Sequence, residues 1–297
     1  MTADIAILAR AKVNLGLKVL GPRHDGFHNV DTVLQAVELS DLVRIRVRSA
    51  GESRVTVWCN HQQVPAGSSN LAHQAAILFL SSMDAGVRVD VSISKVIPVG
   101  AGLGGGSADA AAVLFGLSLI TDQDVPTTDL AAQLGSDVPF FLAGGSCRAT
   151  GRGTRLEQLR PHARLAEMAL LLVKPPFSVS AGDAYRSWIP GQSDMEIDPI
   201  VSLLARGDTK KLPQLLFNDL EPGVLRSHPS LGEIKEAMVR EGLKPLMSGS
   251  GSTLVALLPD GRRAWDTALW IKRRFPSLTV LVTRPALASP LEVIRQT

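Results

Sequence analysis

The first half of the chain alternates apolar and polar residues over several short segments, which is the pattern of half-buried β-strands. A run of apolar residues with helical spacing predicts a helix over residues 69–82, and a run of strong helix formers predicts another over 108–119. Residues 129–134 predict a short helix, and Pro139 favours an extended start for a strand over 138–142. The alternating segments predict strands over 5–20, 30–39, 42–48, 54–59 and 89–97.

From about residue 160 the pattern changes to helices between fewer strands. Strands are predicted over 168–173, 254–258 and 278–283. Helices are predicted over 183–188, 200–205, 210–217, 231–240 and 262–275. Counted with the bend that leads into 254–258, the order is strand, helices, strand, strand, helix, strand, which is the split βαβ order of a ferredoxin-like domain. We therefore predict an α+β protein with two domains, residues 1–160 and 161–297.

Composition supports this division and narrows the classes of partner. A chain of 297 residues can form two domains, each with its own core. Aromatic residues make up 4%, with a single Tyr, which disfavours a base-stacking surface for nucleic acid. The net charge of +3 comes without a dense Lys/Arg cluster and favours an anionic small molecule over a duplex. We expect no nucleic-acid partner.

Cysteine usage and the apolar runs indicate the compartment. Cys59 and Cys147 have neither the pattern of a disulfide framework nor metal-site spacing, so a reducing compartment is expected. The first residues lack the layout of a signal peptide, and the longest apolar runs are too short to span a bilayer. We expect a cytoplasmic protein with no membrane partner, as a monomer or a weak homodimer.

The strongest chemical signal is the segment 98–112, where five glycines lie among the seven residues 100–106. Glycines adopt positive φ and leave backbone N–H groups open to an anion, and the following helix adds the positive end of its dipole. Ser107 is expected to cap that helix or to reach a phosphate or its metal, and Asp109 to complement the dipole. The sequence therefore predicts a phosphate-binding loop.

Other interpretations of this loop are weaker. A P-loop needs a lysine after its second glycine, and no lysine lies between Val96 and Lys174. Residues 100–105 formally match a dinucleotide fingerprint, but the acidic residues that follow, Asp122 and Asp124, fall in a predicted turn rather than at the end of a second strand. A glycine-rich turn without a ligand explains one or two glycines, not five.

Three further groups of polar residues stand in unusual places. Lys12 and Asn14 interrupt an apolar strand, where they could lie at a sheet edge and pair with backbone or could belong to a site. The turn-rich segment 21–28 carries two histidines and a phenylalanine, and ligand contacts concentrate in such loops. Asp137 could form an Asx-turn after the helix or act as a functional carboxylate.

Taken together, the motifs resemble those of the GHMP kinases, a family named for galactose, homoserine, mevalonate and phosphomevalonate kinases. Residues 11–17 with 25–28, the loop 98–112, and Ser248-Gly-Ser-Gly-Ser-Thr253 carry the resemblance along nearly the whole chain. Together with Gly135–Pro139 and Phe217–Glu221, they are similar to the 4-diphosphocytidyl-2-C-methyl-D-erythritol kinases within that family. The resemblance implies a two-domain fold with an N-terminal ribosomal-protein-like β/α domain and a C-terminal ferredoxin-like domain.

The resemblance also implies an activity. Those kinases use ATP and Mg2+ to phosphorylate the 2-hydroxyl of the methylerythritol moiety in the non-mevalonate isoprenoid precursor pathway. Asp137 would be the catalytic base and Lys12 its cationic partner. The implied substrate pocket contains Asn14, Phe27, His28, which would recognise the cytosine edge, and Tyr185. The residues implied to hold ATP are Asn70, Leu71, Lys95, Pro98, Gly100, Gly102, Leu103, Gly104, Gly105, Gly106, Ser107, Gly249, Ser250 and Gly251.

Some alternatives stay open at this point. The resemblance implies no protein ligand for Mg2+, which could be held by phosphates and water. Another GHMP small-molecule kinase, of the homoserine or mevalonate type, would share most of these motifs, although His28 with Phe27 disfavours it. A non-catalytic ligand sensor could keep the fold, although the presence of Lys12, Asp137 and Ser107 disfavours it.

Overall fold

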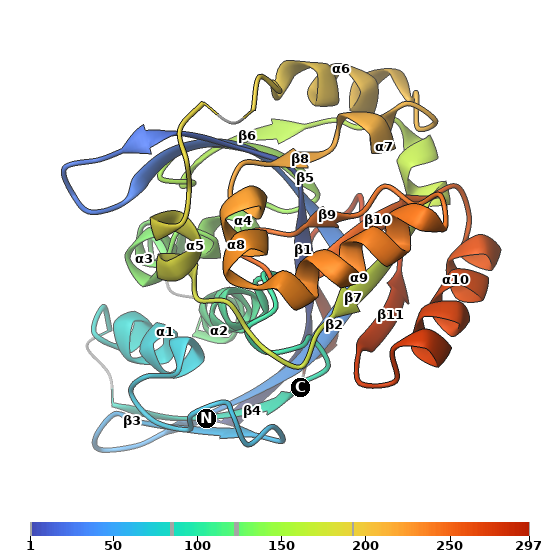
Figure 1. Ribbon diagram of the computed structural model, residues 1–297. Coiled ribbons are helices and arrows are strands. Elements are labelled where there is room, and N and C mark those ends of the chain that lie inside the picture. Colours follow the sequence, from blue (N-terminus) through green and yellow to red (C-terminus); the bar gives the residue numbers. More distant parts are fainter. Residues whose placement is uncertain (1, 84–85, 122–124, 192, 297) are drawn as a thin grey trace.

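The computed structural model describes residues 2–83, 86–121, 125–191 and 193–296, which fold into two β-sheets with helices packed on them (Figure 1). Asp122 and Asp124 lie outside the described residues. The first sheet has the order β12-β1-β2-β4-β3, with β5 and β8 paired to β2 and β1, and β6 paired to β5. Its strands are β1 (Thr2–Pro22), β2 (His28–Ser49), β3 (Arg54–Cys59), β4 (Val87–Ser94), β5 (Ser146–Gly151), β6 (Arg155–Leu159), β8 (Phe217–Asn218) and β12 (Leu291–Gln296).

The long antiparallel pair β1 and β2 forms the centre of this sheet. The prediction of two separate strands over 30–39 and 42–48 was wrong, because β2 continues through Asp41. The Asp41 carboxylate accepts hydrogen bonds from the N–H groups of Val96 and Ile97, so this buried polar residue is satisfied without a turn. In place of a break between two strands, the pairing of β1 with β2 has a register shift between Arg10 and Lys12, as in a β-bulge.

Four helices pack near this sheet: α1 (Leu71–Leu80), α2 (Gly105–Thr121), α3 (Thr127–Leu134) and α4 (Val138–Ala143) (Figure 1). The alanine-rich α2 lies against β1 and β2 in one hydrophobic core. Its first backbone hydrogen bond runs from the Ala108 N–H to the Gly104 carbonyl. The helix therefore begins before Ser107, and the prediction that Ser107 is its N-cap was wrong.

The prediction of a strand over 138–142 was also wrong, because this segment forms the helix α4. Pro139 lies in the first turn of α4, where its missing N–H needs no partner and its fixed φ suits a helix. The consequence is that Asp137 lies at the N-terminus of a helix.

The second sheet has the order β11-β7-β10-β9, with every neighbouring pair antiparallel. In chain order this is 4-1-3-2, which confirms the predicted ferredoxin-like domain. Its strands are β7 (Ala169–Lys174), β9 (Leu246–Met247), β10 (Leu254–Leu258) and β11 (Thr279–Thr283). The helices of this part of the chain are α5 (Ala181–Arg186), α6 (Asp198–Arg206), α7 (Leu212–Leu215), α8 (Glu221–Ser227), α9 (Pro229–Arg240) and α10 (Gly261–Arg274).

Both faces of β7 and β10 are buried, which explains their unbroken apolar sequences. Leu171 and Val173 point into the core formed with α9 and α10. Leu170 and Leu172 point the other way, into a core shared with Val13 of β1. The second sheet is thereby packed directly against the strand that carries Lys12.

The last described strand, β12, returns to pair antiparallel with β1, and β8 pairs with β1 in parallel. The chain therefore crosses back to the first sheet twice, and the domain boundary at 160/161 stays a prediction. The strand before the glycine loop, β4, pairs antiparallel with β2. Because β1 and β2 are antiparallel as well, the parallel sheet required by a dinucleotide-binding fold is absent from the described residues.

The contact of α8 with the end of α5 yields a stability prediction. A Cβ atom on Gly223 would lie 2.1 Å from the carbonyl oxygen of Ser187, which cannot move without shifting backbone. We expect Gly223→Ala to lower the free energy of unfolding by about 1–3 kcal/mol in urea denaturation. The control is Gly232→Ala in α9, which meets no atom within 4 Å and should raise it by about 0.5–1 kcal/mol. Equal effects of the two substitutions would contradict the packing described.

Candidate active site

Two pockets meet at the glycine loop. The first, of about 350 Å³, is lined by the loop and by residues from the start of α1. The second, of about 520 Å³, is lined by β1, the 26–28 segment, α5 and the start of α4. Gly102, Gly104 and Ser107 line both pockets. A ligand in one pocket can therefore touch a ligand in the other at the glycine loop.

The predicted nucleotide-binding residues of the first half of the chain gather on the smaller pocket. Residues lining it include Asn70, Leu71, Lys95, Pro98, Gly100, Gly102, Leu103, Gly104, Gly105, Gly106 and Ser107. The Asn70 side chain is already engaged, because its oxygen caps α1 at the Ala72 N–H (2.8 Å) and its nitrogen donates to the Pro65 carbonyl (2.7 Å). Asn70 thus fixes the wall of this pocket at the start of α1.

Three glycines of the loop, Gly100, Gly102 and Gly104, have positive φ angles. At Gly102 the requirement for glycine is strictest, because a Cβ atom would lie 2.2 Å from the Ser248 carbonyl oxygen. In addition, the Ser248 hydroxyl donates a hydrogen bond to the Gly102 carbonyl (3.1 Å). The glycine loop and the 248–253 segment are therefore in direct backbone contact.

Beneath the smaller pocket lies a buried charge cluster. The Lys95 ammonium is 2.6 Å from a carboxylate oxygen of Asp41 and 2.5 Å from one of Asp109. Burial raises the pKa of Asp109 to about 7, Lys95 opposes this shift, and Asp41 adds to it. The prediction that Asp109 complements the helix dipole was wrong: Asp109 lies beyond the first turn of α2 and its carboxylate pairs with Lys95.

The larger pocket contains the predicted lysine and aspartate. The buried Lys12 ammonium donates a hydrogen bond to the Asn14 side-chain oxygen (2.8 Å) and lies 3.4 Å from a carboxylate oxygen of Asp137. The Asn14 nitrogen donates in turn to the Thr32 hydroxyl (2.9 Å). The Asp137 side chain makes no capping hydrogen bond at α4 within the described part of the chain, and it is 39% exposed. Its carboxylate is thus open to the pocket.

An aromatic group lines the far end of this pocket. The His28 ring is stacked on Tyr185, with centroids 4.9 Å apart and planes at 25°. Burial, and to a smaller extent Asp137, raises the pKa of Tyr185 to about 12. Phe27 is 48% exposed, and its ring lies 5.1 Å from the Arg152 guanidinium carbon. These aromatic side chains line the larger pocket, and the Arg152 cation lies beside Phe27.

Two residues of this region were missed from sequence. Trp188 meets the His28 ring edge-on at 5.7 Å, and Arg152 lines the pocket beside Phe27. The sequence does contain a signal for Arg152, because the glycines at 151 and 153 indicate a turn, and ligand contacts concentrate in such loops.

Of the three predicted ATP-binding residues in segment 249–251, two line the larger pocket and one does not. Gly249 and Ser250 line the larger pocket, and a Cβ on Gly249 would lie 3.2 Å from the Lys12 nitrogen and 3.3 Å from the Asn14 oxygen. Gly251 lines neither of these two pockets, and its N–H donates to the Ser248 carbonyl (2.9 Å). The structure brings all the other predicted site residues to the two adjoining pockets.

The described residues contain neither a cluster of metal-binding side chains nor a helix that could span a membrane. They contain no group of three or more His, Cys, Asp or Glu side chains that could hold a metal ion. None of the helices formed by them is both long and apolar enough to cross a bilayer.

Comparisons with known proteins identify the family to which this chain belongs. Two family models match the chain: GHMP kinases N terminal domain over residues 70–145 and GHMP kinases C terminal over 200–266. A curated 4-diphosphocytidyl-2-C-methyl-D-erythritol kinase of Pelotomaculum thermopropionicum is 41% identical over 286 residues, which cover 94% of this chain and 97% of that protein. The chain belongs to the 4-diphosphocytidyl-2-C-methyl-D-erythritol kinase family of GHMP kinases.

Other members of this kinase family and of the wider GHMP fold match over similar lengths. The kinase of Acaryochloris marina is 39% identical over 298 residues, with 93% of this chain and 94% of that protein covered. A crystal structure of a 4-(cytidine 5'-diphospho)-2C-methyl-D-erythritol kinase is 34% identical and has a TM-score of 0.75, covering 95% of this chain and all of that one. The homoserine kinase of Cytophaga hutchinsonii, with a TM-score of 0.78 at 18% identity and 98% and 97% coverage, shares the fold.

The buried cluster yields a prediction about pH and stability. The folded-state pKa of Asp109 is raised from 3.8 to about 7, so between about pH 4 and 7 the folded protein binds a proton that the unfolded chain does not. The free energy of unfolding gained from this bound proton is fully present below about pH 4 and is lost as the pH rises through 7. We expect Asp109→Asn, which cannot ionise, to gain stability relative to the parent protein as pH rises, by a few kcal/mol.

The measurement is urea denaturation of both proteins at pH 5, 6, 7 and 8. Glu236→Gln serves as a control, because Glu236 is exposed and pairs only loosely with Arg240 at 3.7 Å. Its stability difference from the parent protein should not change over this range. A constant difference for Asp109→Asn would show that this carboxyl has the same pKa in the folded and unfolded chains.

Proposed function

We propose that this chain is an ATP-dependent kinase that phosphorylates the 2-hydroxyl of 4-diphosphocytidyl-2-C-methyl-D-erythritol. One observation carries the proposal: the paired Lys12 and Asp137 lie in a pocket that shares Gly102, Gly104 and Ser107 with a second pocket. That arrangement suits a donor phosphate in one pocket and an acceptor hydroxyl in the other. Membership of the kinase family supports the substrate class.

In this proposal the glycine loop binds the phosphates of ATP. The positive φ angles of its glycines and the start of α2 place backbone N–H groups and a helix dipole at the smaller pocket. Lys95 acts indirectly, because its ammonium is committed to Asp41 and Asp109 and so holds β2 to α2 beneath the nucleotide. Gly249 and Ser250 close the site from the second sheet.

Mg2+ would come with the nucleotide rather than being held by protein carboxylates. The side chain that fits it best is Ser107, which lines both pockets, and the described residues include no group of three or more His, Cys, Asp or Glu side chains that could hold a metal ion. When bound, Mg2+ neutralises charge on the phosphate oxygens.

Asp137 would accept the proton of the acceptor hydroxyl. A carboxylate is too weak a base to deprotonate an alcohol beforehand, but it can take the proton as the oxygen bonds to phosphorus. The Lys12 ammonium lies 3.4 Å from the Asp137 carboxylate, where it draws the hydroxyl and the transferred phosphoryl group into line. Asn14 helps to hold Lys12 in place by accepting a hydrogen bond from its ammonium.

The aromatic group would bind the cytidine end of the acceptor. Phe27 and Tyr185 offer ring faces for stacking, and the His28 ring nitrogens can hydrogen-bond to the base. A homoserine or mevalonate kinase has no base to stack, so this group favours the cytidyl substrate over those two. The carboxylate of Asp137, open to the pocket and paired with Lys12, favours a kinase over a non-catalytic sensor.

The test is ATP-dependent phosphorylation of 4-diphosphocytidyl-2-C-methyl-D-erythritol by the parent protein and by Asp137→Asn. We expect the substitution to lower kcat by about 10²–10⁴-fold, because the amide cannot accept a proton, while ATP binding measured by calorimetry changes little. Both proteins should unfold at similar urea concentrations, since the Asp137 side chain makes no capping bond among the described residues.

Mevalonate and homoserine serve as control acceptors. Neither should be phosphorylated at a comparable rate. If either is the better acceptor, the cytidyl assignment fails and the kinase assignment survives. If ATP binds and none of the three acceptors reacts, the sensor interpretation takes precedence.

A further inference from the structure

The segment 217–221 lies outside both pockets of the candidate site, yet its side chains hold the loop that closes them. Asn218 is 5% exposed, and its side-chain nitrogen donates to the carbonyl oxygens of Met247 and Gly249, each at 2.7 Å. Its side-chain oxygen accepts from the Leu220 N–H at 2.9 Å. The whole amide is therefore used within the protein, and both of its N–H groups are directed to the 247–249 backbone.

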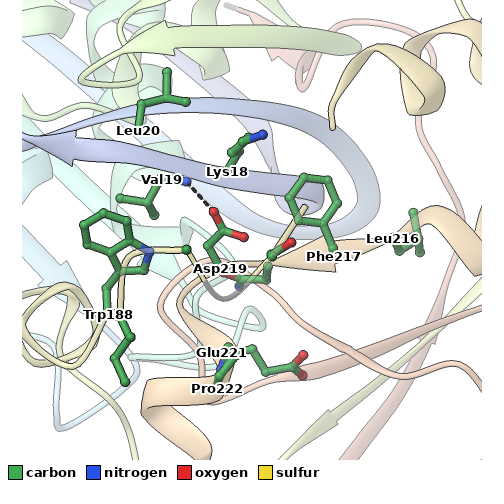
Figure 2. Close-up of a pocket in the computed structure, with 13 residues that line it drawn as sticks. Lys18, Val19, Leu20, Trp188, Leu216, Phe217, Asp219, Glu221 and Pro222 are labelled. Carbon is green, nitrogen blue, oxygen red and sulfur yellow. Dashed lines mark hydrogen bonds between the residues drawn. The ribbon is translucent and has the colours of Figure 1, made fainter. Parts of the chain in front are cut away.

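The same segment is fastened to β1, the strand that carries Lys12. Residues 217 and 218 form β8 and pair with Gly16 and Leu17. The Asp219 N–H donates to the Leu17 carbonyl at 2.9 Å. Its carboxylate accepts from the Val19 N–H, also at 2.9 Å (Figure 2). Asn218 thus stands at a fixed place relative to β1.

Segment 217–221 holds the N–H group of Met247 as well as its carbonyl oxygen. Glu221 accepts a hydrogen bond from the Met247 N–H (3.1 Å) and pairs with Lys235 of α9 (2.6 Å). Beyond Met247 the backbone depends on glycine, with φ of +55° at Gly249 and +88° at Gly251. Glycine backbone can adopt many conformations, so the hydrogen bonds that hold this segment decide which conformation it takes.

The position of this loop matters because nothing separates it from the reacting groups. A Cβ on Gly249 would lie 3.2 Å from the Lys12 nitrogen and 3.2 Å from the Gly102 carbonyl oxygen. A shift of the 248–250 backbone would therefore change the space around Lys12 and the phosphate-binding loop at the same time.

We propose that Asn218 is a positioning residue, whose two N–H groups fix the carbonyls of Met247 and Gly249 and so set the place of Gly249 and Ser250 against Lys12 and Gly102. The inference rests on the proposed function for its kinetic consequence. Its structural consequence, the ordering of residues 247–251, is independent of any activity.

The variant that tests it is Asn218→Asp, which keeps the shape of the side chain and the acceptor for Leu220. It removes both donors and turns a carboxylate oxygen toward two carbonyl oxygens. We expect kcat/KM for ATP to fall by at least about tenfold, because two buried hydrogen bonds are lost and their carbonyl acceptors are left without these donors. The kcat/KM for the cytidyl acceptor should fall by a similar factor, because Gly249 and Ser250 line the larger pocket beside Lys12. Asn218→Ser, which adds no charge, should show the same pattern with a smaller loss.

Hydrogen exchange supplies a readout that needs no activity. In the parent protein the Ser248 N–H donates to the Thr253 carbonyl and the Gly251 N–H donates to the Ser248 carbonyl, both at 2.9 Å. We expect peptides that cover 246–253 to exchange at least about tenfold faster in both Asn218 variants, while β1 and β2 keep their protection.

The matched control is Asp219→Asn at the next position. Asp219 bonds to β1 and not to the loop, and an asparagine can still accept from Val19. Its kinetic constants and the exchange of 246–253 should equal those of the parent protein.

The outcomes separate the inference from the proposed function. Faster exchange confined to 246–253 supports the inference, even if the parent protein phosphorylates none of the acceptors and the proposed function fails. Unchanged exchange and unchanged ATP kinetics in both Asn218 variants would overturn it. Exchange that rises equally across both sheets, or failure of both variants to fold, would also overturn it, because Asn218 would then support the fold rather than the loop.

Discussion

The site depends on a close backbone contact between two loops that come from different sheets. No side chain can stand between Gly102 and the Ser248 carbonyl, so the glycine loop before α2 and the loop before β10 meet directly. This contact places the start of α2, the end of β9 and the middle of β1 around one small space. The glycines at 102 and 249 are thus required by packing as well as by the phosphate they are proposed to bind.

Charge in the site is arranged in two layers. At the surface of the larger pocket, Lys12 and Asp137 form a pair whose carboxylate is open to solvent and substrate. At the smaller pocket, Lys95 binds Asp41 and Asp109, and none of these three side chains is more than 4% exposed. The outer pair is free to exchange a proton with a ligand, whereas the inner cluster links β2 to α2 and so supports the glycine loop from below.

Much of this arrangement could be predicted from local sequence. The glycine loop was predicted because five closely spaced glycines have few other uses, and the ferredoxin-like order followed from the succession of strands and helices. Local pattern failed where a distant partner decides the outcome. The strands predicted over 30–39 and 42–48 are one strand, and Asp109 was expected to complement the helix dipole. Neither Asp41 nor Asp109 reveals in sequence that Lys95 or the backbone of 96–97 lies beside it.

The same limit applies to residues 138–142 and to the edge strands. The apolar run after Asp137 fits either a strand or a helix. Pro139 is compatible with the start of a strand and with the first turn of a helix. The pairing of β12 and β8 with β1 has no local signal at all. The meeting of Lys12 with Asp137 was implied by family resemblance, since the spacing of two residues on different elements does not determine their distance.

The most direct test of the central claim is a crystal structure of the protein with a non-hydrolysable ATP analogue and 4-diphosphocytidyl-2-C-methyl-D-erythritol. The account predicts that the γ-phosphate lies against Gly102, Gly104 and Ser107. It also predicts that the acceptor 2-hydroxyl lies within hydrogen-bond reach of the Asp137 carboxylate, at about 2.6–3.2 Å. A 2-hydroxyl directed away from Asp137, or a γ-phosphate bound outside the junction of the two pockets, would contradict it.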